Sequence, residues 1–151
     1  MSWSPQETSK HQDHVVAHVL GATVLGFFIA DEAAHVLLDM GFIWTIYLDC
    51  EMGLLPQSVT VSELDLDEKI KAELLSDISL LHEQGRAAEE ALKRFVAAPA
   101  DCLIVDVSFY ADDERRRIFL TGEHECLAIE TSLTTGEISF AAAPTGLSNP
   151  G

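Results

Sequence analysis

The stretch ATVLGFFIADEAAHVLLDMGFIWTIYLDC, residues 22–50, is almost continuously apolar, and it decides how this chain folds. Strands that are covered on both faces show such apolar runs, whereas strands with one solvated face alternate between apolar and polar residues. The run therefore predicts buried strands at about 22–30 and 42–50.

The connector between these strands, residues 31–41, allows two interpretations. Asp31 fits the N-cap of a short helix, and Gly41 fits the position just after its last turn. The sequence AHVLLD, residues 34–39, is equally compatible with a strand in a hairpin. The preceding segment, 12–20, is open in the same way between a short helix and a strand.

Between Asp65 and Ala98 the apolar residues recur every three or four positions, which predicts a helix with one apolar face. Asp65 with Glu68 three residues later fits an N-cap, and Pro99 ends the helix. An unbroken helix of this length would measure about 50 Å, which is too long for one domain of this size. Gly85 therefore marks either a break in the helix or a close contact with another helix.

The last third of the chain has the pattern of a β-meander, in which four strands alternate with the turns ADDE, GEHE and TTGE. Alternation predicts one apolar face, which on the first strand consists of Leu103, Val105, Val107 and Phe109. We expect this face to pack against the long helix. The opposite face predicts cross-strand charge pairs, and it carries Asp106, Arg115, Arg117 and Glu130.

These elements together predict a single α+β domain over residues 1–143. We expect an antiparallel or mixed sheet of about five or six strands, with the C-terminal meander covered by one helix that is either long or broken at Gly85. The remaining residues, 144–151, consist of turn formers without periodicity, so we expect a loosely ordered tail.

The charge of the chain restricts its partners. Its 151 residues include 25 Asp and Glu against 9 Lys and Arg, for a formal net charge of −16. Such a charge repels phosphate backbones and anionic lipid, so we expect neither nucleic acid nor a membrane as partner. A basic protein is the partner that this charge would attract. Three cysteines without C-x-x-C spacing and the lack of a signal-peptide pattern predict a cytoplasmic protein with reduced thiols.

Two stretches carry residues that could bind a metal ion. In LDCEM, residues 48–52, Asp49 and Glu51 would lie on one face of a strand, where two carboxylates could hold a divalent metal. This stretch resembles the first motif of the DEDD-type 3′ to 5′ exonucleases. The resemblance implies metal-bound carboxylates, but the residues that follow His82 and His124 do not match the last motif of that family.

The second stretch is HQDHVVAHV, residues 11–19. On a helix, His11, His14 and His18 would lie within about 60° of one another. On a strand only His14 and His18 would share a face, and His35 would have to complete a three-ligand site.

The sequence lacks a P-loop, a G-x-S-x-G elbow, a G-x-G-x-x-G loop and an H-E-x-x-H motif. We therefore expect a non-catalytic, acidic interaction module without a cofactor, of the binding, chaperone-like or immunity-like kind, that forms a homodimer. The alternative is a protein that binds a divalent metal, or a metal-dependent hydrolase. Its candidate ligands are His14, His18, His35, Asp49 and Glu51.

Overall fold

The computed structural model describes residues 3–99, 102–123 and 125–144. In this part of the chain, ten strands form two antiparallel five-stranded sheets. The sheet that we call the meander sheet has the order β1 (Ser4–Pro5), β7 (Asp106–Asp112), β8 (Arg115–Thr121), β9 (Glu125–Ser132) and β10 (Ile138–Pro144). The other, which we call the central sheet, has the order β5 (Met52–Pro56), β4 (Phe42–Tyr47), β3 (Ala33–Leu38), β2 (Val24–Ala30) and β6 (Val96–Ala97).

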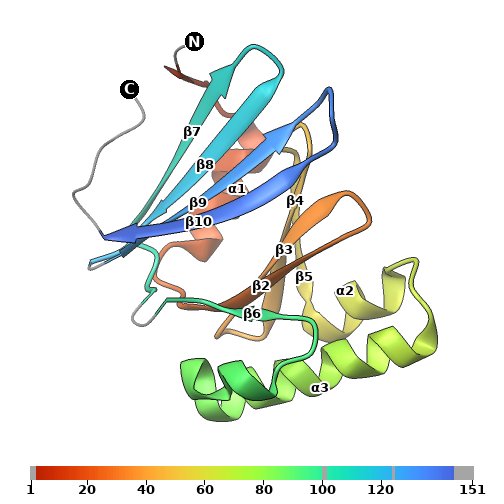
Figure 1. Cartoon of the computed structure of the whole chain (residues 1–151). Coiled ribbons are helices and arrows are strands. Elements are labelled where there is room, and N and C mark those ends of the chain that lie inside the picture. The colour runs from red at the N-terminus through yellow and green to blue at the C-terminus, as the bar shows by residue number, and fades with distance from the viewer. Residues whose placement is uncertain (1–2, 100–101, 124, 145–151) are drawn as a thin grey trace.

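The helices lie on both sides of the central sheet (Figure 1). They are α1 (Lys10–Val19), α2 (Gln57–Glu63), α3 (Glu68–Gln84) and the 3-10 helix η1 (Gly85–Ala91). The predicted α+β class and the C-terminal meander are confirmed. The expectation of one sheet is wrong, because the apolar strands of the first half and the meander form separate sheets. Residues 145–151 of the predicted tail lie outside the described residues, and the domain boundary at 143 stays a prediction.

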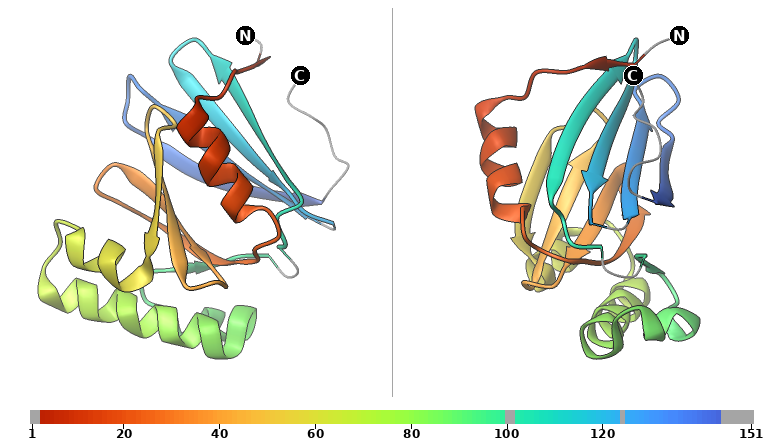
Figure 2. Two further views of the ribbon diagram at one scale, coloured as in Figure 1. Left: turned by 180° about the vertical axis from the view of Figure 1, so that it is seen from behind. Right: turned by 90° about the vertical axis from the view of Figure 1, so that its left-hand side faces the viewer.

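The central sheet is covered on both faces, which explains its continuous apolar sequence. All six residues of β3 are buried. Val36 belongs to a core that the central sheet shares with the meander sheet and α1. Leu37, which points the other way, belongs to a second core that includes Leu74 and Leu81 of α3. Figure 2 shows α1 lying between the β5 edge of one sheet and the β7 edge of the other.

The open assignment of 31–41 resolves to a strand. β2 and β3 form a hairpin whose two turn residues, Asp31 and Glu32, have φ angles of 52° and 57°. Two-residue hairpin turns with positive φ at both positions match the twist of the flanking strands. The segment 12–20 resolves to a helix, because α1 spans Lys10–Val19 with Ser9 and Gln12 forming a capping box.

The open assignment at Gly85 resolves to an interruption of the α-helix. α3 ends at Gln84, and Gly85 adopts a φ of 58°, a left-handed region that favours glycine. The N-cap of α3 is Asp67 and not Asp65, because the Asp67 side chain accepts a hydrogen bond from Ile70 N at 2.9 Å. The helix covers the central sheet and not the meander, so the expected partner of its apolar face was wrong.

The alternation predicted from residue 103 onward is met only from Val107, which packs against the core as expected. Leu103 and Val105 are 36% and 52% exposed, while Cys102 and Ile104 are buried. The reason is local, because Ile104 N donates to the carbonyl of Ala22 at 2.8 Å and this pairing sets which residues point inward before β7 begins.

The charge pairs expected on the outer face of the meander are confirmed for three of the four residues. Arg115 and Arg117 both pair with Glu130, at 2.8 and 2.7 Å. The same two guanidinium groups lie over the ring of Trp3, at 5.0 and 4.1 Å from its centroid, so the N-terminal segment is held against the meander by cation–π contacts.

One buried carboxylate joins α3 to the chain that returns after η1. Asp77 is 1% exposed, and it accepts hydrogen bonds from the backbone N–H groups of Lys93, Arg94 and Phe95 at 2.6 to 3.0 Å. These three amides lie just before β6 and would otherwise lack a partner in a helix or strand.

We expect the Asp77→Ala substitution to lower the free energy of unfolding by about 3 kcal/mol or more, because it leaves three amides of one segment without their acceptor. Asp77→Asn keeps one acceptor oxygen and should lose less. Chemical denaturation measures both, and Glu83→Ala, which removes an exposed acid of the same helix, serves as the control. Equal stability of Asp77→Ala and Glu83→Ala would contradict this role.

Candidate functional site

The five metal candidates lie at three separate places in the structure. His14 and His18 are on the exposed side of α1, one turn apart, with ring centroids 4.6 Å from each other in an edge-on arrangement. His35 lies on the opposite face of the central sheet. A full layer of strands therefore separates it from the two helix histidines, and the three imidazoles cannot meet at one ion.

His35 is a buried, fully hydrogen-bonded side chain. It is 2% exposed and stacks on Phe28. Its Nε2 lies 3.0 Å from the carbonyl oxygen of Ala30 and its Nδ1 lies 3.0 Å from Thr45 Oγ1. Because a carbonyl only accepts, Nε2 carries the proton and Nδ1 accepts from the Thr45 hydroxyl. Burial lowers the pKa of His35 below its ordinary 6.5.

Asp49 and Glu51 lie in the turn between β4 and β5, and not on a strand face. β4 ends at Tyr47, and Cys50 has a φ of 69°. Asp49 Oδ1 accepts the backbone N–H of Glu51 at 3.0 Å, so this carboxylate stabilises the turn. Within the described ranges, no three His, Cys, Asp or Glu side chains are placed to hold one metal ion.

The β2–β3 and β4–β5 turns lie at the same end of the central sheet, since both hairpins are antiparallel and adjacent. Two depressions of about 220 and 300 Å³ lie beside them and share Asp31 and Tyr47. We call this combined surface the hairpin-tip hollow. Their charged lining residues are all acidic, namely Asp31, Glu32, Asp49 and Glu63.

The hollow also exposes large side chains with apolar surface. Tyr47 is 47% exposed and lies between the two depressions, while Leu55 and Leu133 flank them at 43% each. A hollow that combines an exposed aromatic ring with several carboxylates can bind a cation with an apolar stem, because such a group uses both features at once.

The inner wall of the hollow contains an unpaired hydroxyl. Thr60, on α2, is 6% exposed, and its Oγ1 has no hydrogen-bond partner. It lines the smaller depression together with His35 and Thr45. A buried hydroxyl without a partner loses its solvation without compensation, and a donor or acceptor on a ligand would supply the missing bond.

The sequence did not indicate a cation-binding role for Tyr47 or Thr60. The acidic turn residues could have indicated the hollow, because assigning 31–41 to a hairpin places Asp31 and Asp49 at the same end of the sheet. Thr60 depends on α2, a short helix that the apolar periodicity did not reveal.

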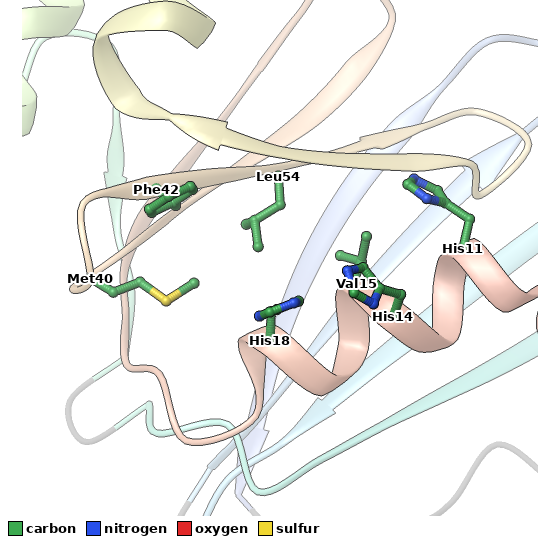
Figure 3. Close-up of a pocket in the computed structure, with 7 residues that line it drawn as sticks. All are labelled: His11, His14, Val15, His18, Met40, Phe42 and Leu54. Atoms are coloured by element: carbon green, nitrogen blue, oxygen red, sulfur yellow. The ribbon is translucent and has the colours of Figure 1, made fainter.

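A second pocket, of about 340 Å³, lies on the other face of the central sheet, between α1 and the strands β4 and β5 (Figure 3). His11, His14 and His18 form its helix side, and apolar residues form the rest. His11 is already engaged, because its Nε2 donates to the Met52 carbonyl at 2.8 Å and so links α1 to the edge of β5.

The buried neutral state of His35 makes stability depend on pH. As the pH falls below 6.5, the imidazole of the unfolded chain takes up a proton, whereas the folded one, whose pKa burial lowers, takes one up only at a lower pH. The unfolded state then binds more protons, so stability is lost with falling pH, by up to about 1.4 kcal/mol per pH unit from this group.

We expect His35→Gln to lose this part of the pH dependence, whereas His82→Gln, at an exposed position on α3, should keep it. Chemical denaturation between pH 8 and pH 5 gives the comparison. A wild-type slope that persists unchanged in His35→Gln would show that other groups cause it.

Comparison with protein-family models, curated proteins and solved structures found no match to this chain. Among the described residues, no helix combines the length and the apolar character needed to cross a membrane. The hairpin-tip hollow is the candidate binding site.

Proposed function

We propose that this protein is a non-catalytic interaction module that binds a basic segment of a partner protein in the hairpin-tip hollow. The observation that carries the proposal is a hollow whose charged lining residues are all acidic, arranged around the exposed ring of Tyr47. The inserted group would be a Lys or Arg side chain.

The size and polarity of the smaller depression support one inserted side chain. Its volume of about 220 Å³ is below the range usual for pockets that enclose drug-sized ligands. Asp31 and Glu63 at the rim would pair with the cationic head, and the unpaired Thr60 hydroxyl would accept from it. The aliphatic stem would lie along Tyr47 and Leu55.

The net charge of −16 supports the same partner class. A strongly acidic molecule raises the local concentration of basic partners and accelerates encounter, and added salt weakens this effect. A catalytic role for the hollow is disfavoured by His35, since both of its ring nitrogens are used within the protein.

We also infer that the protein self-associates through β10, the last strand of the meander sheet. β10 carries no charged residue, although the chain has 34 of them in total by the counts of 25 acidic and 9 basic residues. Natural edge strands are usually short, charged or covered, because an open edge invites pairing with another strand.

The hydrogen-bond pattern shows which groups of β10 face outward. Ser132 N donates to the Glu137 carbonyl at 3.0 Å. From this pair onward, every second residue of β10 exchanges backbone hydrogen bonds with β9. Ile138, Phe140 and Ala142 therefore direct their backbone N–H and C=O groups away from β9. A second β10 in antiparallel orientation would pair with these groups and join two meander sheets across a two-fold axis.

Binding to the hollow is tested with a fluorescent Arg-rich peptide and two variants of equal charge. Asp31→Asn with Glu63→Gln removes two carboxylates from the hollow, and Glu68→Gln with Glu83→Gln removes two exposed ones from α3. We expect the first double variant to bind about tenfold more weakly or worse, which corresponds to about 1.4 kcal/mol, and the second to bind nearly as the wild type does.

Tyr47→Ala should also weaken peptide binding without any change in charge, and added salt should weaken it in every variant. Equal losses in the two double variants would mean that the peptide responds only to overall charge, and the proposal would then be wrong.

Self-association is tested by sedimentation of Ala141→Lys against Ala72→Lys. Both place one lysine at an exposed position, but only the first lies on β10. We expect a wild-type dimer that salt strengthens, because it screens the repulsion of two acidic copies. Ala141→Lys should be monomeric and Ala72→Lys dimeric. A wild type that stays monomeric at high concentration would contradict the inferred dimer.

A further inference from the structure

The pocket between α1 and the strands β4 and β5 contains two imidazoles that the protein itself does not use. His14 and His18 are exposed and contact each other, and neither ring has a hydrogen bond within the described part of the chain. Their spacing of four residues places both on one face of the helix. Their lone pairs are therefore available to a ligand that binds between them.

A thioether enters the same pocket from the opposite side. Met40 lies in the turn between β3 and β4 and is 41% exposed, so it is not a core methionine. Figure 3 shows its side chain extending along the pocket toward His18. The turn that carries it is held in place, since the Asp39 carboxylate accepts Thr23 N at 3.0 Å and Gly41 has a φ of 84°.

The remainder of the pocket is apolar, with Val15, Phe42 and Leu54 as its walls. No carboxylate and no thiol is among the lining residues that the structure describes. The donor set is therefore two imidazole nitrogens and one thioether sulfur beside apolar walls.

This donor set determines which ion fits. Thioether and imidazole ligands select copper(I), a soft ion that accepts few ligands. Zinc is usually held by four ligands drawn from thiolates, imidazoles and carboxylates, and a methionine sulfur does not replace them. Calcium and magnesium require oxygen ligands.

We propose that His14, His18 and Met40 form a copper(I) site. The site lies on the α1 side of the central sheet, whereas the hairpin-tip hollow lies on the α2 side, so copper binding and peptide binding are independent of each other.

Cysteine thiols would compete with the proposed site, because they also bind copper(I). Cys50 and Cys102 are buried, and burial raises the pKa of the Cys50 thiol to about 12. Cys126 is replaced by serine in the protein that carries all further substitutions. Copper(I) is supplied without oxygen, in competition with a chromophoric copper(I) chelator.

We expect one copper(I) per Cys126→Ser chain. His14→Ala, His18→Ala and Met40→Leu should each weaken binding by at least about tenfold, the smallest effect usual for groups that support a metal. The two imidazoles alone would bind zinc more weakly than copper(I), and Met40→Leu should leave that zinc binding unchanged, because zinc does not use the thioether. His82→Ala, on α3, is the matched control and should bind as the parent does.

All three ligand residues are exposed, so the variants should fold as the parent does, and circular dichroism checks this. Copper binding that is lost with Cys126→Ser alone would assign the copper to that thiol and overturn the proposal. The same conclusion follows if His14→Ala and Met40→Leu bind copper(I) as tightly as the parent, or if Met40→Leu weakens zinc and copper equally.

Discussion

The double burial of the central sheet is the constraint on which the rest of the structure depends. A strand such as β3, buried at every position, needs a layer on each face. The meander sheet and α1 supply one layer, and α2 and α3 supply the other. Polar and aromatic groups collect where the hairpins end in turns. The hairpin-tip hollow lies at one such end.

The same arrangement separates two candidate binding surfaces by one sheet. On the α2 side, turn carboxylates surround Tyr47, and on the α1 side imidazoles face Met40. Each surface combines residues that are far apart in sequence, since a turn of the sheet and a helix contribute to both. Four of the five predicted metal ligands divide between these surfaces, since His14 and His18 line the pocket beside α1 whereas His35 and Asp49 line the hollow.

Local patterns predicted much of the secondary structure. The three- and four-residue periodicity predicted α3, and alternation with turn signals predicted the meander, while Gly85 left a break in the helix as one of two possibilities. They did not predict the layers, since an apolar face indicates burial without naming its partner. The helix that was expected to cover the meander packs on the central sheet. Cys102 and Ile104 point inward because a bridge between Leu103 and Thr23, just before β2, sets their register.

The candidate sites show the same division. Composition and spacing were sufficient to indicate an acidic module and to group His14 with His18, because charge is additive and four residues make one helical turn. Only the tertiary structure placed Asp31 and Glu63 in one hollow with the unpaired Thr60 hydroxyl. It also placed His35 on the face opposite α1, and Met40 in the same pocket as the two histidines. These residues become neighbours because of how the layers pack on one another. That packing depends on contacts between side chains that are far apart in the sequence, and a local sequence pattern does not specify such contacts.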